Sequence, residues 1–186
     1  MSEAQTAGFV LTIGHSNRSL EEFLRLLESN GVTLLVDVRT RPRSRHNPQF
    51  DLETLPASLA ARGIGYRHAP ALGGLRRSAP DSPNDGWADP ARRGFADYMR
   101  TEGFVLALED LIARLGGARV ALMCAEADPA NCHRSLIADA LAARRCDVRH
   151  IVAEDAPHPH RITPWARVAG GRVEYPAVAP RLPGIP

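Results

Sequence analysis

The chain has 186 residues, of which 44% are hydrophobic and 24% charged, a length and composition that suit one folded domain and exclude a coiled coil or a wholly disordered protein. Its 23 basic and 21 acidic residues give a formal net charge of +2, too balanced for a protein that coats nucleic acid or an anionic membrane with its whole surface. All the basic residues are arginines, which excludes enzymes that need a Schiff-base lysine or a Walker-type phosphate loop.

The hydrophobic pattern predicts strands that alternate with helices. Short apolar runs predict strands at residues 9–13, 33–38, 64–68, 120–124 and 148–152. Apolar residues at helical spacing, with capping residues before them or glycine after them, predict helices at 20–30, 52–62, 104–115 and 129–145. The nearly continuous apolar run at 34–38 is typical of a strand buried on both faces of a parallel sheet. We therefore expect an α/β, Rossmann-like fold with an open, mostly parallel sheet of about five strands flanked by helices.

The chain is expected to form a single α/β domain over residues 1–152, followed by an extended C-terminal tail. Residues 73–94 are rich in glycine, proline, aspartate, asparagine and serine without any period, so they predict a long loop and a candidate lid. Residues 153–186 are proline-rich and predict the tail. A small hairpin within 164–175 is expected around Gly170-Gly171.

Polar residues follow the predicted strands where a doubly wound sheet places its ligand crevice, beyond the carboxyl ends of the strands. They are His15 and Ser16, Asp37 and Arg39, Gly73 and Gly74, and Cys124 and Glu126. We expect these separate parts of the chain to meet at one edge of the sheet. The last predicted helix begins near Cys132, His133 and Arg134, where backbone amides and the helix dipole favour an anion.

These residue types suit acid–base and nucleophilic chemistry on an anion. Glu126 or Asp37 is the expected acid or base, His15 the expected proton shuttle, and Cys124 an optional nucleophile. Arg39 and Arg134 are expected to hold the anion. The other expected substrate-binding residues are Ser16, Ser44, Gly73, Gly74, Cys132 and His133.

Structural roles stay open beside these functional ones. Cys124 at the end of a buried strand could be an inert small hydrophobe, and Asp37 and Arg39 could simply pair with each other. His15 could bond its own backbone. No cofactor is expected, since the glycine pair is too short for a dinucleotide-binding loop. The alternative of a metal ion held by Cys124, Cys132 and His133 lacks the paired short spacing of structural zinc sites.

Charge is concentrated in one segment. Residues 38–77 hold eight arginines against two acidic residues, which favours contact with a phosphate group or nucleic acid.

Three cysteines and no basic-then-apolar N-terminal segment favour the cytoplasm. No stretch approaches the roughly 18 consecutive apolar residues of a membrane helix, so we expect no contact with a membrane. From the arginine-rich segment we expect an anionic small molecule or nucleic acid as partner. The oligomeric state is left open.

Several short motifs occur in a fixed order along the chain: TIGHS at 12–16, DVR at 37–39 with PRS at 42–44, LGG at 72–74, FADYM at 95–99, MCAE at 123–126 and CHR at 132–134. Together they resemble the bacterial and archaeal domain-of-unknown-function family 488, over roughly residues 9–175. The resemblance implies a compact α/β domain and carries no established reaction. From the site residues we expect a hydrolase or group transferase acting on a phosphate-bearing substrate such as a nucleotide or nucleic-acid component. The alternative is a non-catalytic module that binds nucleotide or nucleic acid.

Overall fold

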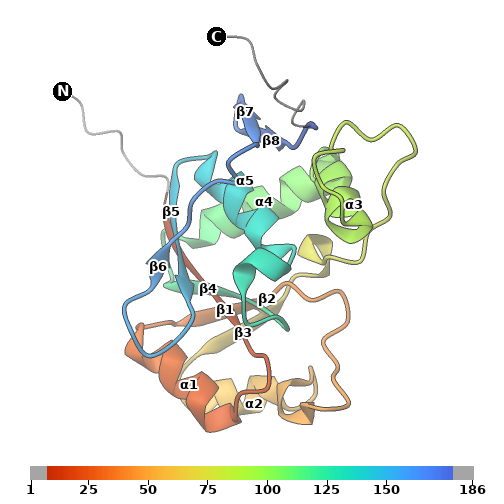
Figure 1. The fold of residues 1–186 in the computed structure, drawn as a ribbon. Coiled ribbons are helices and arrows are strands. Elements are labelled where there is room, and N and C mark those ends of the chain that lie inside the picture. Colours follow the sequence, from red (N-terminus) through yellow and green to blue (C-terminus); the bar gives the residue numbers. More distant parts are fainter. Residues whose placement is uncertain (1–7, 178–186) are drawn as a thin grey trace, which may run out of the picture.

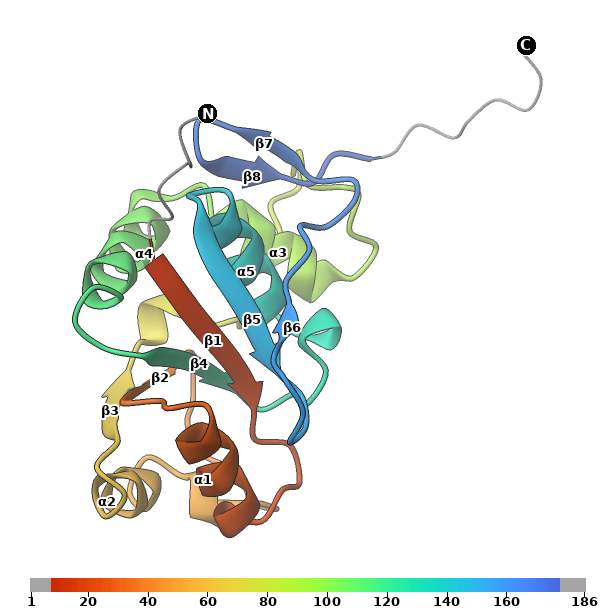
Figure 2. The same cartoon turned by 90° about the vertical axis from the view of Figure 1, so that its left-hand side faces the viewer.

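The computed structural model describes residues 8–177, which form a six-stranded sheet with helices on both faces and a separate two-stranded sheet (Figures 1 and 2). The six strands lie in the order β3-β2-β4-β1-β5-β6. The first five run parallel and span Gly8–Gly14 (β1), Leu34–Asp37 (β2), Gly65–His68 (β3), Val120–Cys124 (β4) and Cys146–Ile151 (β5). The predicted Rossmann-like, mostly parallel α/β architecture is therefore confirmed. The sixth strand, β6 (His158–Pro159), pairs antiparallel with β5 and is too short to leave a pattern in the sequence.

The register of the central strands decides where the polar residues meet. Every residue of β4 is buried, as its continuous apolar run predicts for a strand covered on both faces. Gly14 of β1 lies beside Cys124 of β4, and Asp37 of β2 lies beside Met123. The backbone N–H of His15 then donates to the Cys124 carbonyl over 3.0 Å. The ends of β1, β2 and β4 are thus level, and the residues that follow them share one edge.

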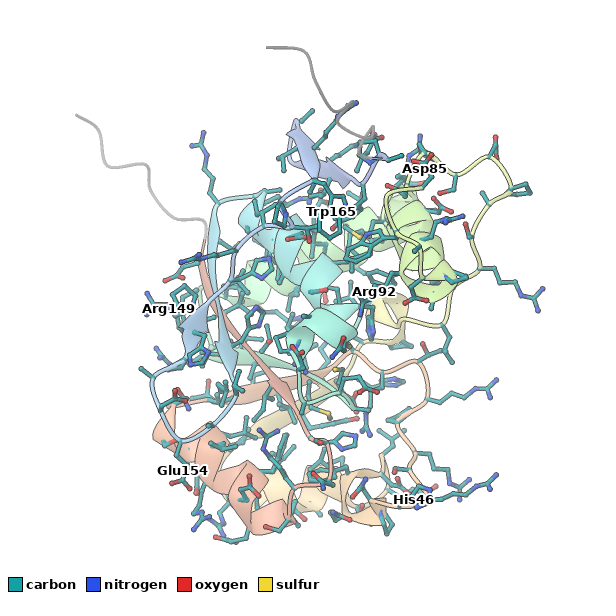
Figure 3. All side chains as sticks on the ribbon, in the orientation of Figure 1. His46, Asp85, Arg92, Arg149, Glu154 and Trp165 are labelled. Atoms are coloured by element: carbon teal, nitrogen blue, oxygen red, sulfur yellow. The ribbon has the colours of Figure 1, made fainter. Side chains whose placement is uncertain are left out.

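Two helix layers cover the sheet, with α1 (Leu20–Ser29) and α2 (Leu55–Ala60) on one face. The other face carries α3 (Pro90–Tyr98), α4 (Glu102–Arg114) and α5 (Arg134–Ala142). Figure 3 shows side chains filling the space between the sheet and both layers. In α1 the Ser19 hydroxyl accepts the Glu22 N–H, as a helix-capping residue does. Apolar side chains at helical spacing then bury the face towards the sheet.

Helix α3 begins at Pro90, inside the loop that the sequence predicted over 73–94, so that loop is five residues shorter than expected. Asp89 caps the helix by accepting the Ala91 N–H, and Pro90 occupies the first turn. The pattern was missed because Gly94 lies in mid-helix, where glycine usually disfavours a helix. A Cβ at Gly94 would lie 2.6 Å from the Arg76 carbonyl oxygen, so the glycine lets the loop pack directly on α3.

The loop before α3 is bound to that helix at several points. The Asp97 carboxylate of α3 accepts hydrogen bonds from the Ser82 hydroxyl, the Asn84 amide and the Ala79 N–H. Asn84 is fully buried, and its Oδ1 accepts the Tyr175 N–H. These contacts connect the loop both to α3 and to the C-terminal segment, so the expected lid lies packed against the domain.

The C-terminal segment also packs against the domain as far as residue 177. After β6, strands β7 (Arg167–Ala169) and β8 (Arg172–Glu174) form a hairpin. Tyr175 is fully buried and donates its hydroxyl to Asp139 of α5 over 2.8 Å. The predictions for residues 1–7 and 178–186 lie outside the described residues. No helix within residues 8–177 is long and apolar enough to cross a membrane.

Candidate functional site

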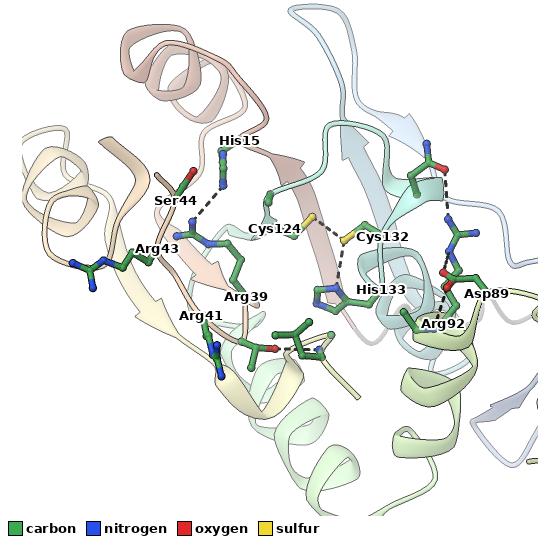
Figure 4. A pocket seen from close by; sticks show the side chains of 16 residues that line it. His15, Arg39, Arg41, Arg43, Ser44, Asp89, Arg92, Cys124, Cys132 and His133 are labelled. Carbon is green, nitrogen blue, oxygen red and sulfur yellow. Dashed lines mark hydrogen bonds and ion pairs between the residues drawn. The ribbon is translucent and has the colours of Figure 1, made fainter. Parts of the chain in front are cut away.

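A cleft of about 360 Å³ opens beyond the carboxyl ends of β1, β2 and β4, beside the start of α5 (Figure 4). Seven residues predicted from the sequence line it: His15, Arg39, Ser44, Gly74, Cys124, Cys132 and His133. Segments that lie far apart in the sequence thus meet around one hollow. Further lining residues that the sequence analysis did not assign include Thr40, Arg41, Arg43, Asp89, Arg92 and Asn131.

Arg134 does not lie in the cleft, which corrects its expected role as an anion ligand. Its side chain is fully buried, and its Nη1 donates to the carbonyl oxygens of Ile13 and Glu126 over 2.6 and 3.1 Å. It thereby ties the end of β1 to the loop between β4 and α5. Glu126 itself is exposed and does not line the cleft, so the expected acid or base lies outside the hollow.

Asp37 and Arg39 form a buried ion pair, the structural alternative left open by the sequence. Arg39 Nη2 lies 2.6 Å from Asp37 Oδ2, and Arg39 Nε lies 2.9 Å from Oδ1. The Tyr66 hydroxyl also donates to Asp37 over 2.8 Å, and burial raises the pKa of that tyrosine. Since Asp37 is fully buried and does not line the cleft, it is not positioned to exchange a proton with a ligand there.

His15 lines the cleft and is held as a neutral ring. Its Nδ1 lies 2.9 Å from the Ser16 carbonyl oxygen, and its Nε2 lies 3.3 Å from Arg39 Nη1. Burial lowers the pKa of His15, so Nδ1 donates to the carbonyl and Nε2 accepts from the guanidinium. The ring also stacks on Phe50 with centroids 4.5 Å apart. His15 therefore orients Arg39, and its ring nitrogens are both occupied.

Cys124 and Cys132 place two thiol groups on the wall of the cleft, with their sulfurs 2.9 Å apart (Figure 4). The hydrogen bond from Cys124 lowers the pKa of Cys132 to about 4, with further help from His133 and the Arg134 backbone N–H. The hydrogen bond with Cys132, together with burial, raises the pKa of Cys124. These opposite shifts favour ionisation of Cys132 over ionisation of Cys124. The position of Cys132 at the N-terminus of α5 adds the favourable field of the helix dipole.

His133 lies against the Cys132 sulfur and is held from behind. Its Nε2 donates to the Val38 carbonyl over 3.0 Å, which leaves Nδ1 facing the Cys132 sulfur at 3.4 Å. A Cβ at Gly74 would lie 2.4 Å from Nδ1, so Gly74 makes room for the ring. A nucleophile, a base beside it and a group that orients the base are the parts of a nucleophilic site. The end of a predicted strand made Cys124 an optional nucleophile in the sequence; the geometry favours Cys132.

The remaining residues that the sequence predicted for the site make contacts outside the pair of Cys132 and His133, which we call the Cys132–His133 dyad. Ser16 was predicted to bind substrate but does not line the cleft. Its backbone φ of 49° is in the left-handed region, and its N–H donates to the Ala125 carbonyl over 2.8 Å. Gly73 does not line the cleft either, and a Cβ there would lie 2.4 Å from Thr40 Oγ1. The Ser44 hydroxyl lines the cleft and accepts the Asn47 N–H over 3.1 Å.

A comparison with protein-family models matches residues 19–141 to a family described as "Domain of unknown function DUF488". The chain belongs to this family. A search of curated proteins found no match, and a search of solved structures found none either. The matched part of the DUF488 chain includes both cysteines and all the arginines of the cleft, whereas His15 precedes it.

The arginines at the mouth of the cleft are the residues that sequence reasoning missed in this DUF488 protein. Arg41 and Arg43 are exposed, line the cleft and make no ion pair with any residue of the described part of the chain. Arg92 of α3 lies on the opposite side of the cleft, where its side chain is 3.5 Å from Asp89 and 3.4 Å from Asn131 Oδ1 (Figure 4). The arginine excess of residues 38–77 was the available signal for Arg41 and Arg43, but it did not say which guanidinium groups stay free, and Arg92 lies outside that segment.

The cleft of the DUF488 domain contains sulfur and imidazole groups that metals favour. Even so, within residues 8–177 no three or more His, Cys, Asp or Glu side chains are grouped to hold a metal ion. The ring of His133 uses Nε2 on a backbone carbonyl and turns Nδ1 towards Cys132. The arrangement therefore suits thiol chemistry on a ligand that the arginines attract.

Proposed function

We propose that this protein is a cytoplasmic hydrolase or group transferase that acts on an anionic, phosphate-bearing substrate such as a nucleotide or a nucleic-acid component. The observation that carries the proposal is the position of the Cys132–His133 dyad on the wall of a cleft whose mouth holds unpaired arginines. A low thiol pKa supplies the nucleophile, and the arginines supply the affinity for an anion. The two features occur within one hollow of about 360 Å³.

Arg41 and Arg43 are the anion-binding groups in this proposal. A guanidinium group donates two parallel hydrogen bonds to a phosphate or carboxylate, which fixes orientation as well as charge. Arg39 lines the cleft as well, but Asp37 and the Phe50 carbonyl already bind its Nη2. Arg92 is likewise engaged by Asp89 and Asn131. We therefore assign Arg39 to holding the cleft wall and the unpaired Arg41 and Arg43 to the ligand.

Cys132 attacks the electrophilic phosphorus or carbonyl carbon of the substrate. A bond forms between sulfur and that atom, while the bond to the leaving group breaks and its electron pair departs with the leaving group. His133, which takes up the thiol proton, passes that proton to the leaving group. Water or an acceptor alcohol then attacks the same atom, gives its proton to His133 and releases the Cys132 thiolate. The contact with Cys124, whose sulfur lies 2.9 Å away, favours the ionised form of Cys132.

Binding is tested with inorganic phosphate and a panel of nucleotides, by thermal shift and then by calorimetry. A ligand that binds only the native state raises the melting temperature. We expect the double variant Arg41→Ala/Arg43→Ala to weaken binding at least about tenfold, since each lost charge-assisted hydrogen bond is worth roughly 1.5–3 kcal/mol. Arg45→Ala is the matched control, because Arg45 is exposed in the same segment but does not line the cleft. Equal losses in the two variants would count against the assignment.

Catalysis is tested on any phosphate ester or nucleotide that binds. Cys132→Ser is expected to lower kcat at least about a thousandfold and to retain affinity, because the oxygen nucleophile lacks the low pKa of the thiol. Cys146→Ser is the control, since Cys146 does not line the cleft. Unchanged turnover by Cys132→Ser would remove the nucleophile from the proposal. Tight binding with no turnover by the wild-type protein would instead favour the binding module.

A further inference from the structure

The two cleft cysteines are arranged for a reaction that needs no phosphate-bearing substrate. Their sulfurs are free thiols 2.9 Å apart, and a disulfide requires a separation of about 2.05 Å. We propose that Cys124 and Cys132 form a reversible thiol–disulfide pair, oxidised by hydroperoxides through Cys132, with Cys124 as the resolving cysteine. This proposal rests on the geometry of the two thiols and not on the proposed catalytic function.

Both sulfurs are carried by ordered backbone, so little movement separates the reduced and oxidised states. Cys124 is the last residue of β4, where its carbonyl accepts the His15 N–H over 3.0 Å. Cys132 precedes α5, and its N–H donates to the Pro129 carbonyl over 3.2 Å. The sulfurs need to approach by less than 1 Å, which rotation of the two side chains can supply.

The surroundings give the two cysteines different parts in the reaction. Cys132 lines the cleft, and its ionisation is favoured over that of Cys124. Thiolates are the form that attacks peroxides. Cys124 is 1% exposed against 7% for Cys132, so a peroxide entering the cleft meets Cys132 more readily. Arg134 Nη1 lies 3.0 Å from the Cys124 sulfur. A guanidinium at that distance stabilises the negative charge that Cys124 acquires when it loses its proton.

The reaction balances with a hydroperoxide as the two-electron oxidant. The Cys132 thiolate attacks the terminal peroxide oxygen, the O–O bond breaks, and the departing alkoxide takes a proton and leaves as an alcohol, or as water when the oxidant is hydrogen peroxide. Cys132 becomes a sulfenic acid. Cys124 then attacks the Cys132 sulfur, an S–S bond forms, and the sulfenic hydroxyl leaves as water with the proton of the Cys124 thiol. Two thiols are oxidised and one peroxide is reduced.

Cys146 is the built-in control for this proposal. It is the first residue of β5 and lies beside Gly8, whereas Cys124 lies beside Gly14 at the other end of β1. Six residues of extended strand separate the two positions by roughly 20 Å. Cys146 is also buried, and burial raises its pKa. It can neither reach the pair nor react readily with peroxide.

The test treats the purified full chain with one equivalent of hydrogen peroxide, alkylates it with N-ethylmaleimide in denaturant and measures the intact mass. The three cysteines of the reduced chain each take one label. We expect oxidation to leave a single label, on Cys146, with a Cys124–Cys132 disulfide in the peptide map and full recovery of labelling after dithiothreitol. Three labels after oxidation, or a disulfide that involves Cys146, would overturn the proposal.

Single variants separate the two roles. In Cys124→Ser, the sulfenic acid on Cys132 has no resolving partner, so we expect dimedone to trap it. In Cys132→Ser, Cys124 is expected to resist one equivalent of peroxide, and Cys146→Ser is expected to form the disulfide as the wild type does. Dimedone labelling of Cys124 in place of Cys132 would reverse the assignment and refute it. Because the readout is thiol mass, the result is independent of whether a phosphate-bearing substrate is ever turned over.

Discussion

Two polar clusters adjoin α5, one around Asp139 within the helix and one in the cleft beside its N-terminal end, and they differ in whether their hydrogen-bonding groups are used. In the Asp139 cluster the carboxylate is fully buried and accepts from His160, Tyr175 and both the N–H and the hydroxyl of Thr163. In the cleft, Arg41 and Arg43 have no ion-pair partner in the part of the chain that the structure describes. Saturated donors and acceptors indicate a structural role, whereas free donors at a cavity indicate a ligand.

The hydrogen-bond directions in the Asp139 cluster follow from one another. His160 Nε2 donates to Asp139 over 2.8 Å, so its Nδ1 accepts from His150 Nε2 at 3.0 Å. His150 Nδ1 then accepts from the Thr12 hydroxyl over 2.7 Å. A cavity of about 450 Å³ adjoins these histidines and is larger than the cleft. The ring nitrogens of His150 and His160 are all engaged in these hydrogen bonds, so the size of this cavity alone does not identify it as the site.

The largest expected effect comes from breaking the Asp139 cluster. Asp139→Ala leaves the His160, Thr163 and Tyr175 donors without an acceptor, and removing one partner of a buried network costs about 3–5 kcal/mol. Urea denaturation measures this loss in the free energy of unfolding. Glu126→Ala is the control, because that carboxylate is exposed, and it is expected to change stability by less than about 0.5 kcal/mol. A loss below about 1 kcal/mol in Asp139→Ala would mean that the cluster is not structural.

The same cluster predicts sensitivity to acid. Burial, together with the nearby His160, lowers the pKa of His150 to about 4, while an unfolded histidine titrates near 6.5. The unfolded state therefore binds more protons between these values, and stability is complete above pH 6.5 and falls towards pH 4. The expected loss between pH 7 and 4.5 is about 2 kcal/mol. His150→Gln keeps a polar side chain and should flatten this part of the pH profile; an unchanged slope would assign the effect to other groups.

The sequence predicted the sheet well because the signals for strands, runs of apolar residues, are local in the chain. The apolar runs at β1, β2 and β4 are continuous, and parallel strands with level ends bring His15, Asp37 and Cys124 to one edge. It did not predict which polar groups are free, because that depends on contacts between distant segments. Arg134 reads as an anion ligand in the linear order, but the Ile13 carbonyl, 121 residues away, takes its hydrogen bond. Likewise, only the folded chain shows that Gly74 makes room for the His133 ring.

A substitution in the cleft is expected to have a smaller effect on stability than the loss of Asp139. Gly74→Ala places a methyl group 2.4 Å from His133 Nδ1, so the ring must shift away from Cys132. Overpacking of this kind costs about 1–2 kcal/mol, and we expect slower alkylation of Cys132 at neutral pH because the thiolate loses a partner. Gly117→Ala is the matched control, since nothing lies within 4 Å of its added Cβ. Equal alkylation rates in the two variants would show that His133 does not act on Cys132.

The smallest expected effect on stability comes from substituting Cys132, and the most specific measurement is the alkylation rate of its thiol. Cys132→Ser is expected to change the free energy of unfolding by less than about 1 kcal/mol, because the cleft accepts a polar atom at that position. The reactivity of the wild-type thiol is different: with its pKa lowered to about 4, Cys132 stays ionised throughout the neutral range. Its alkylation rate by iodoacetamide, followed by peptide mapping, should change less than about twofold between pH 8 and 6. A thiol of ordinary pKa loses about tenfold per pH unit there, and the buried Cys146, whose pKa burial raises, provides that reference within the same sample. A tenfold fall per unit at Cys132 would show that the cleft holds a neutral thiol, and the contrast with the saturated Asp139 cluster would then rest on the arginines alone.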